Sequence, residues 1–246
     1  MSALFKHLWI QFKIDIRERG TLMTYYLVPL VFYFVMGAVF SSINPLARQT
    51  LPATMPIFAV TMGAVLGLPV PIVKMREFGV LRAYHVCGIP EGAVLFIQSI
   101  SAFFHLLVVS IIIFVTAPVF FEASYPKSFF AYFLSLLILL FVSIALGVLI
   151  GMVARNQSIA LMLSQSIFLP TVLLSGIMFP TSMLPQPLRM LGRILPATYI
   201  MQSFSGLGFG LPTDINAAFS LLIAAGIGVA AVIFIVIKLK ALEKSL

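Results

Sequence analysis

The stretch SFFAYFLSLLILLFVSIALGVLIGMV, residues 128–153, contains no Asp, Glu, Lys, Arg or His. A helix needs about 20 mostly apolar residues to cross the roughly 30 Å hydrocarbon core of a bilayer. This stretch is long enough, and it is apolar on every side, whereas the strands of a membrane β-barrel alternate polar and apolar residues. It therefore predicts a transmembrane helix.

Five further stretches have a similar composition, and His105 is the only ionisable residue of these types in any of the six. The whole chain agrees with a membrane protein, because 61% of its 246 residues are hydrophobic, 9% are charged and the mean hydropathy is +1.15. We predict one all-α integral membrane domain over residues 1–246. Its six transmembrane helices are expected at residues 22–42, 53–73, 92–121, 128–153, 158–178 and 215–237.

The lysine and arginine residues predict the orientation, because basic residues are retained on the cytoplasmic side of short loops. With the N-terminus inside, six spans return the C-terminus to the same side. The basic residues on the cytoplasmic side are then Lys6, Lys13, Arg17, Arg19, Lys74, Arg76, Arg82, Arg155, Lys238, Lys240 and Lys244. Those on the external side are Arg48, Lys127, Arg189 and Arg193. Both termini are therefore expected in the cytoplasm, and the net charge of +8 does not require nucleic-acid binding.

The first twenty residues have an amphipathic helical pattern. Charged residues such as Lys13 and Asp15 fall largely away from an apolar stripe. We predict an interfacial helix over residues 1–20, with an apolar face that includes Phe5, Leu8, Trp9 and Phe12. The alternative is that this segment extends the first span, although Gly20 favours a break before it.

Residues 74–91 form the longest charged loop on the inner side. Five charged residues lie here beside the apolar Phe78, Val80 and Leu81. This composition is compatible with a docking surface and also with a solvated connector that only fixes the topology.

Residues 179–212 are apolar but contain prolines at positions 180, 185, 187 and 196. These prolines divide the segment into pieces that are too short to cross the membrane. We predict one or two short re-entrant or interfacial helices on the outer side. A seventh span is the alternative, but it would place the C-terminal lysines outside.

His105 is a candidate functional residue, because an ionisable group inside a span is costly to bury. A neutral imidazole can also be satisfied by one hydroxyl group, and a histidine without an acidic partner makes a poor proton relay. Structural packing is therefore the other interpretation. The G-x-x-x-G pairs Gly63–Gly67 and Gly147–Gly151 predict close helix packing, within or between subunits.

The absence of several motifs restricts the possible functions. The sequence has no G-x-x-x-x-G-K-[ST] loop, no H-E-x-x-H and no G-x-S-x-G, and Cys87 is its only cysteine. No Asp or Glu lies in the six apolar stretches, which disfavours an ion-driven carrier. We expect a chain that is not an enzyme by itself, binds no cofactor or metal, and is driven by another protein.

Several motifs, in their order and spacing, are similar to the membrane subunit of type-2 ATP-binding cassette (ABC) exporters over nearly the full chain. They are the amphipathic N-terminal helix, Arg76-Glu-Phe-Gly-Val-Leu-Arg82 after the second span, Ala154-Arg-Asn156 after the fourth, Ser175-Gly-Ile-Met-Phe-Pro180, and Leu195-Pro-Ala-Thr-Tyr199. The loop continues as Ala83-Tyr-His-Val-Cys87, which has fewer basic residues than the family leads us to expect.

The resemblance implies a permease that pairs with a second copy or a paralogue and carries two separate cytoplasmic ABC ATPase subunits, which use the ATP. It further implies export of a substrate between the paired subunits. The N-terminal helix would be a second ATPase contact at the membrane surface. By similarity, the ATPase-coupling residues would be Arg76, Glu77, Phe78, Gly79, Leu81 and Arg82. His105, as an ionisable residue inside a span, and Tyr199 are possible pathway residues.

The expected cargo is apolar or amphipathic, such as a drug, a peptide antibiotic or a lipid. No large external domain is present, and most of the 23 Phe are expected to face lipid or packed helices rather than a carbohydrate channel. A bacterial cytoplasmic membrane is the expected location. The alternatives are a non-transporting assembly or immunity partner, and a proton-coupled carrier that uses His105.

Overall fold

The computed structural model describes residues 3–43 and 45–243, and Lys244, one of the predicted inner charges, lies outside this range. The structure is 84% helical and contains no strand in the described ranges. Within these residues, six helical segments are long and apolar enough to cross a membrane, which confirms the predicted all-α membrane fold with six spans. These candidate spans are Arg19–Phe40, Thr50–Glu77, Glu91–Phe121, Phe129–Val153, Gln157–Leu174 and Ala217–Lys240.

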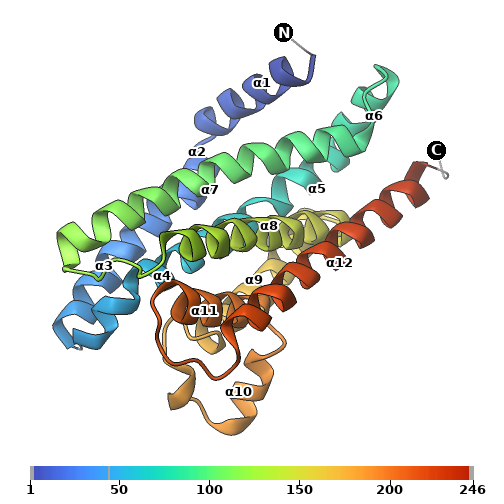
Figure 1. Cartoon of the computed structure of the whole chain (residues 1–246). Helices are drawn as coiled ribbons and strands as arrows, with labels where there is room; N and C mark the ends of the chain where they lie inside the picture. Colours follow the sequence, from blue (N-terminus) through green and yellow to red (C-terminus); the bar gives the residue numbers. More distant parts are fainter. Residues whose placement is uncertain (1–2, 44, 244–246) are drawn as a thin grey trace.

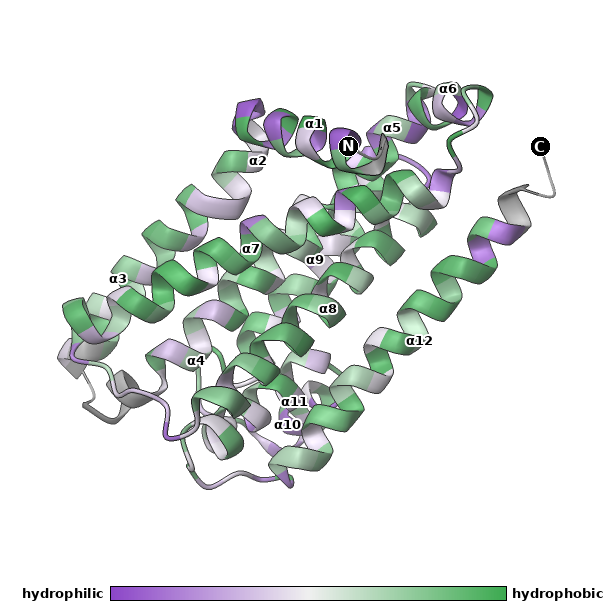
Figure 2. Cartoon of the chain, turned by 45° about the horizontal axis from the view of Figure 1, so that its top comes forward, coloured by the Kyte–Doolittle hydropathy of each residue, from purple (hydrophilic) through white to green (hydrophobic). Residues whose placement is uncertain are grey.

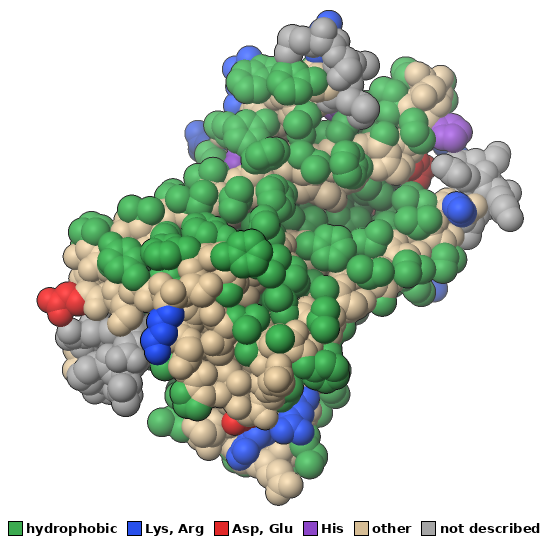
Figure 3. All heavy atoms as spheres, in the orientation of Figure 1, with side chains coloured by type: hydrophobic (Ala, Val, Ile, Leu, Met, Phe, Trp, Pro, Cys, Tyr) green, Lys and Arg blue, Asp and Glu red, His purple; other side chains and the backbone are tan. Residues whose placement is uncertain are grey.

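The helices form one elongated bundle (Figure 1). The N-terminal helix, the segment after the second span and the end of the last helix lie at one end of it, which we call the terminal end. Figure 3 shows a broad hydrophobic surface between charged side chains at the two ends, as expected for a multi-pass membrane protein.

The first two spans are each assembled from several helical pieces. The N-terminal helix and the first span comprise α1 (Ala3–Arg17), α2 (Arg19–Leu22), the π-helical segment η1 (Met23–Leu27) and α3 (Val28–Ile43). The second span comprises α4 (Pro45–Thr61), the π-helical segment η2 (Met62–Gly67) and α5 (Pro69–Glu77).

The remaining elements follow in chain order. They are α6 (Val80–Val86), α7 (Glu91–Phe121), α8 (Phe129–Val153), α9 (Gln157–Leu174), the short 3-10 helix η3 (Thr181–Met183), α10 (Gln186–Gly192), α11 (Pro196–Ser203), the π-helical segment η4 (Phe204–Gly208) and α12 (Ala217–Glu243). The fifth span ends at Leu174 rather than at Met178, and Gly176 then turns the chain with a φ of 85° that few other residues tolerate.

α1 is separate from the first span. Glu18 adopts an extended conformation between α1 and α2, so the break precedes Gly20, which lies inside α2. Figure 2 shows that α1 changes direction at this point and lies across the terminal end of the bundle. The segment therefore does not simply extend the first span.

The glycine pairs place helices in close contact within the chain. A Cβ atom at Gly67 would lie 2.5 Å from Cε1 of Tyr25, whose side chain is 1% exposed. A Cβ atom at Gly147 would collide with the carbonyl oxygen of Ala64, so α8 meets the backbone of η2 at this position. This packing confirms the close approach that the G-x-x-x-G spacing predicts, in its intrachain form.

A hydroxyl group from α8 completes the hydrogen bonding of α4. Pro56 lies inside α4 and has no N–H group to donate to the carbonyl of Pro52, four residues earlier. The fully buried Tyr132 hydroxyl donates to this carbonyl oxygen at 2.7 Å. The bond connects the second and fourth spans through a group that the helix itself leaves unpaired.

Residues 179–212 contain the short helices α10 and α11 and no seventh span. α11 is mostly buried and packs chiefly against α12. Thr198 anchors it, because its hydroxyl lies within 3.1 Å of the Ser175 hydroxyl and 2.5 Å of the Gly192 carbonyl oxygen.

Candidate functional site

The predicted coupling residues lie in a helix–turn–helix at the terminal end. Residues 74–77 continue α5 without a break from the second span, and Phe78 and Gly79 make the turn into α6. Gly79 has a φ of 71°, a left-handed conformation that suits glycine. We call residues 76–82 the coupling segment.

The tip of the coupling segment is exposed, including an aromatic ring. Phe78 is 70% exposed, and Arg82 is exposed with no partner among the residues that the structure describes. Leu81 is buried at 5% exposure and fixes α6 to the molecule. The segment therefore presents an apolar side chain and a cation on a fixed backbone.

Arg76 anchors the base of the coupling segment to the end of the fourth span. Its guanidinium group donates to the carbonyl oxygen of Met152 at 3.2 Å and also to that of Ala154. Met152 lies in the last turn of α8 and Ala154 is its C-cap residue, at the helix end where the carbonyls lack intrahelical donors and the helix dipole favours a cation. Arg76 is thus an internal contact rather than a free surface charge.

Glu77 makes a second internal contact. Its carboxylate accepts a hydrogen bond of 2.7 Å from Nε2 of Gln157, the first residue of α9. Together, Arg76 and Glu77 attach the coupling segment to the turn between α8 and α9. The sequence placed the two residues in one loop but did not predict these partners.

α1 contacts both α6 and α7. The ring of His7 stacks on that of Tyr84 in α6, with centroids 5.2 Å apart. Phe12 stacks on His105 in α7, with centroids 4.3 Å apart and planes 6° from parallel. Phe5 and Trp9 remain 52% and 64% exposed, and Leu8 is partly buried.

Asp15 is buried, although the sequence pattern placed it away from the apolar stripe. Its side chain is 3% exposed and faces α7, where the Ser101 hydroxyl donates to its Oδ2 atom at 2.6 Å. Asp15 follows Leu8 by seven residues and Phe12 by three, so all three share a face of the helix. This spacing is the signal that would have revealed it.

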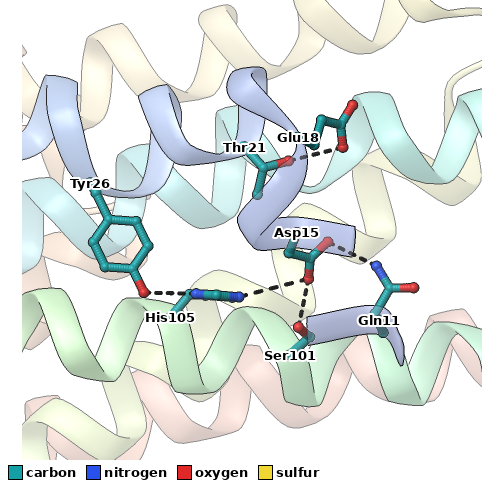
Figure 4. A network of polar contacts seen from close by, with 7 residues as sticks. All are labelled: Gln11, Asp15, Glu18, Thr21, Tyr26, Ser101 and His105. Atoms are coloured by element: carbon teal, nitrogen blue, oxygen red, sulfur yellow. Dashed lines mark hydrogen bonds and ion pairs between the residues drawn. The ribbon is translucent and has the colours of Figure 1, made fainter. Parts of the chain in front are cut away.

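His105 has the acidic partner that sequence reasoning said it lacks. Its Nε2 atom lies 3.9 Å from Oδ2 of Asp15, and its Nδ1 atom lies 2.7 Å from the Tyr26 hydroxyl (Figure 4). The six spans contain no Asp or Glu, and Asp15 comes from α1, which precedes them. The imidazole is 1% exposed, so in this structure it is enclosed.

Tyr199, the other possible pathway residue, lies in α11 far from this network in the sequence. Its hydroxyl donates to the carbonyl oxygen of Arg193 at 2.7 Å. This bond connects α11 to the C-cap residue of α10. The structure does not bring Tyr199 and His105 together in any contact among its described residues.

Comparison with known families matches residues 3–209 to the membrane domain of ABC-2 type transporters. Comparison with curated proteins gives no match. The family match spans the first five candidate spans, the coupling segment and α11. Such domains are membrane transport components rather than catalytic domains, and they generally work with ABC ATPase subunits and dimerise. The chain therefore belongs to the ABC-2 type transporter family, as a permease of an ABC transporter.

Proposed function

We propose that the chain is the permease subunit of an ATP-driven exporter and that separate ABC ATPase subunits dock on the coupling segment. The terminal end then faces the cytoplasm of a bacterial cell, in agreement with its excess of basic residues. The supporting observation is an exposed tip on an anchored base: Phe78 is 70% exposed, while Arg76 hydrogen-bonds to the end of α8. Such a segment can receive a force and transmit it.

The anchoring contacts suggest how movement of an ATPase reaches the spans. α5 belongs to the second span, and Arg76 joins it to the last turn of the fourth. The stack of His7 on Tyr84 connects α6 to α1, and the stack of Phe12 on His105 connects α1 to the third span. A displacement of the coupling segment would therefore reach three spans through direct contacts.

The transported substrate is proposed to be apolar or amphipathic and to pass between two permease subunits, identical or paralogous. The first and fifth spans are the least buried, with 22% of an apolar 18-residue stretch of each buried inside the structure. Their exposed side chains are mostly aliphatic or aromatic, including Phe34 and Leu169. Surfaces of this kind suit a partner subunit, lipid and an apolar cargo better than a hydrophilic one.

The first experiment is co-purification of the tagged chain with its candidate ATPase in detergent. The double variant Phe78→Ser plus Arg82→Ala changes only exposed side chains at the tip and should release the ATPase. Arg76→Gln changes the anchor and should retain the ATPase, while transport substrate no longer stimulates ATP hydrolysis. Tyr125→Ser, which is exposed outside the coupling segment, is the matched control.

Two outcomes would contradict the proposal. If no ATPase associates with the native chain, a non-transporting membrane partner becomes the better assignment. If transport survives ATP depletion but stops when the pH gradient is collapsed, a proton-coupled carrier fits better than an ABC exporter.

A further inference from the structure

Asp15 is a buried carboxyl group whose hydrogen-bond donors are neutral. Ser101 donates to Oδ2 at 2.6 Å and Gln11 donates to Oδ1 at 2.8 Å. Within residues 3–43 and 45–243, no lysine or arginine forms an ion pair with it. Its ionised form therefore lacks a permanent countercharge, which is costly for a side chain that is 3% exposed.

His105 supplies a titratable group on the other side of the contact. Its Nδ1 atom is paired with the Tyr26 hydroxyl, whereas its buried Nε2 atom has no hydrogen-bond partner among the described residues. With Tyr26 as the donor, the ring hydrogen lies on Nε2, the atom that faces Asp15 across 3.9 Å. Figure 4 shows the carboxyl group and the ring edge directed toward each other between α1 and α7.

The two groups are best described as one unit that holds one proton. A proton on the carboxyl leaves both groups neutral, and a proton on the imidazole gives an ion pair, so either state has no net charge. Loss of the proton leaves a buried negative charge. A buried negative charge is more stable when water solvates it, and water reaches Asp15 only if α1 separates from α7.

We propose that Asp15 and His105 form a proton-binding site and that the bound proton holds α1 on α7. The site joins a helix at the bundle's terminal end to a span, so its occupancy determines whether the two move together. The proton site does not depend on the proposed transport function. Its effect on ATPase coupling does, because that effect runs through the stack of His7 on Tyr84.

The surroundings of Asp15 favour a bound proton. The pKa of the Asp15 carboxyl is raised, with burial as the largest cause; the hydrogen bonds from Ser101 and Gln11 lower this pKa, and the negative charge of Glu18 raises it. The other titratable groups that face the site are the phenols of Tyr25 and Tyr26 from η1, which are neutral at physiological pH. Lys13 and Arg17 of α1 are exposed.

The sign of the pH dependence follows from this raised pKa. An acid whose pKa is higher when docked binds its proton more tightly in the docked state, so docking is favoured at low pH. This contribution is lost as the pH rises through the pKa of the docked pair. α1 should therefore separate from α7 on alkalinisation.

The experiment measures the distance between α1 and α7 by electron spin resonance in lipid nanodiscs, without any ATPase. Cys87 is the only cysteine, so a Cys87→Ser chain with Phe5→Cys and Phe96→Cys carries two spin labels at exposed positions. As the pH is raised from acidic to alkaline, the distance distribution should change from narrow to broad as protons dissociate.

Three further variants, each in the labelled chain, assign this change to the pair. Asp15→Asn, which is neutral at every pH, should keep the narrow distribution throughout. His105→Gln should move the transition to lower pH, because one of the two proton-accepting groups is gone. Glu18→Gln removes an exposed carboxylate next to the network and should retain most of the transition.

The proposal is overturned if the native distribution does not change with pH. It is also overturned if Asp15→Asn shows the same transition as the native chain. An unchanged midpoint in His105→Gln would remove His105 from the site. None of these readings depends on an ATPase, so failure of the exporter assignment would leave this test intact.

Discussion

Gly147 provides the most direct test of the helix packing, because a single methyl group decides the outcome. Its Cβ atom would collide with the backbone carbonyl of Ala64, and a backbone atom cannot move aside as a flexible side chain can. Gly226 in α12 is the matched control, since no described atom beyond the local backbone of α12 and the two neighbouring residues lies within 4 Å of the corresponding Cβ position. Both residues lie inside helices that span the membrane.

The two substitutions are expected to change the stability in opposite directions. Alanine in place of glycine stabilises a helix interior by about 1 kcal/mol, and Gly226→Ala should show at most this gain. At Gly147 the extra methyl group forces α8 away from η2, and overpacking of this kind costs about 1–3 kcal/mol. The two variants should therefore differ by about 2 kcal/mol, with Gly147→Ala the less stable.

The assay is thermal unfolding of the purified protein in one detergent. For a chain of about this size, 2 kcal/mol corresponds to a difference of about 4–8 °C in Tm. If Gly147→Ala melts at the same temperature as Gly226→Ala, or above it, α8 and η2 are not in close contact at Gly147.

Three further predictions concern polar and aromatic contacts. Tyr132→Phe should lower the free energy of unfolding by about 1–3 kcal/mol, because the Pro52 carbonyl loses its donor, whereas Tyr125→Phe, at an exposed ring, should leave the Tm unchanged. Thr198→Val should lower the free energy of unfolding by about 1–2 kcal/mol, because a buried hydroxyl that contacts Ser175 and Gly192 is removed. Thermal unfolding measures this loss, and an unchanged Tm would contradict the anchoring role of Thr198. Tyr84→Ala should increase proteolysis within α6 by removing the stack on His7, and an unaltered cleavage rate would show that the stack does not hold α6 in place.

Composition and hydropathy were sufficient to predict the fold class and the number of spans. Each span must satisfy its backbone groups internally and be long enough to cross the bilayer, and both requirements are visible in the sequence. The π-helical geometry of η1 and η2 was not predicted. It accompanies the packing of Tyr25 against Gly63 and Gly67, which are distant in the sequence.

The candidate site was predicted less completely than the fold. The charged loop was identified, but the partners of Arg76 and Glu77 lie about 80 positions away in the sequence, and no local pattern reports such contacts. The network at His105 was missed for a different reason. The acidic partner, Asp15, comes from the N-terminal helix outside the spans, and the composition of the spans does not indicate it.

The bond from Tyr132 to Pro52 also has a consequence for biogenesis. The ribosome delivers the second span to the membrane before the fourth, so the Pro52 carbonyl has no tyrosine donor until α8 arrives. A nascent chain that is truncated before residue 129 should therefore hold its second span loosely and remain exposed to quality-control proteases. Insertion of the fourth span would complete the second, which makes the N-terminal half of this permease dependent on the half that is synthesised after it.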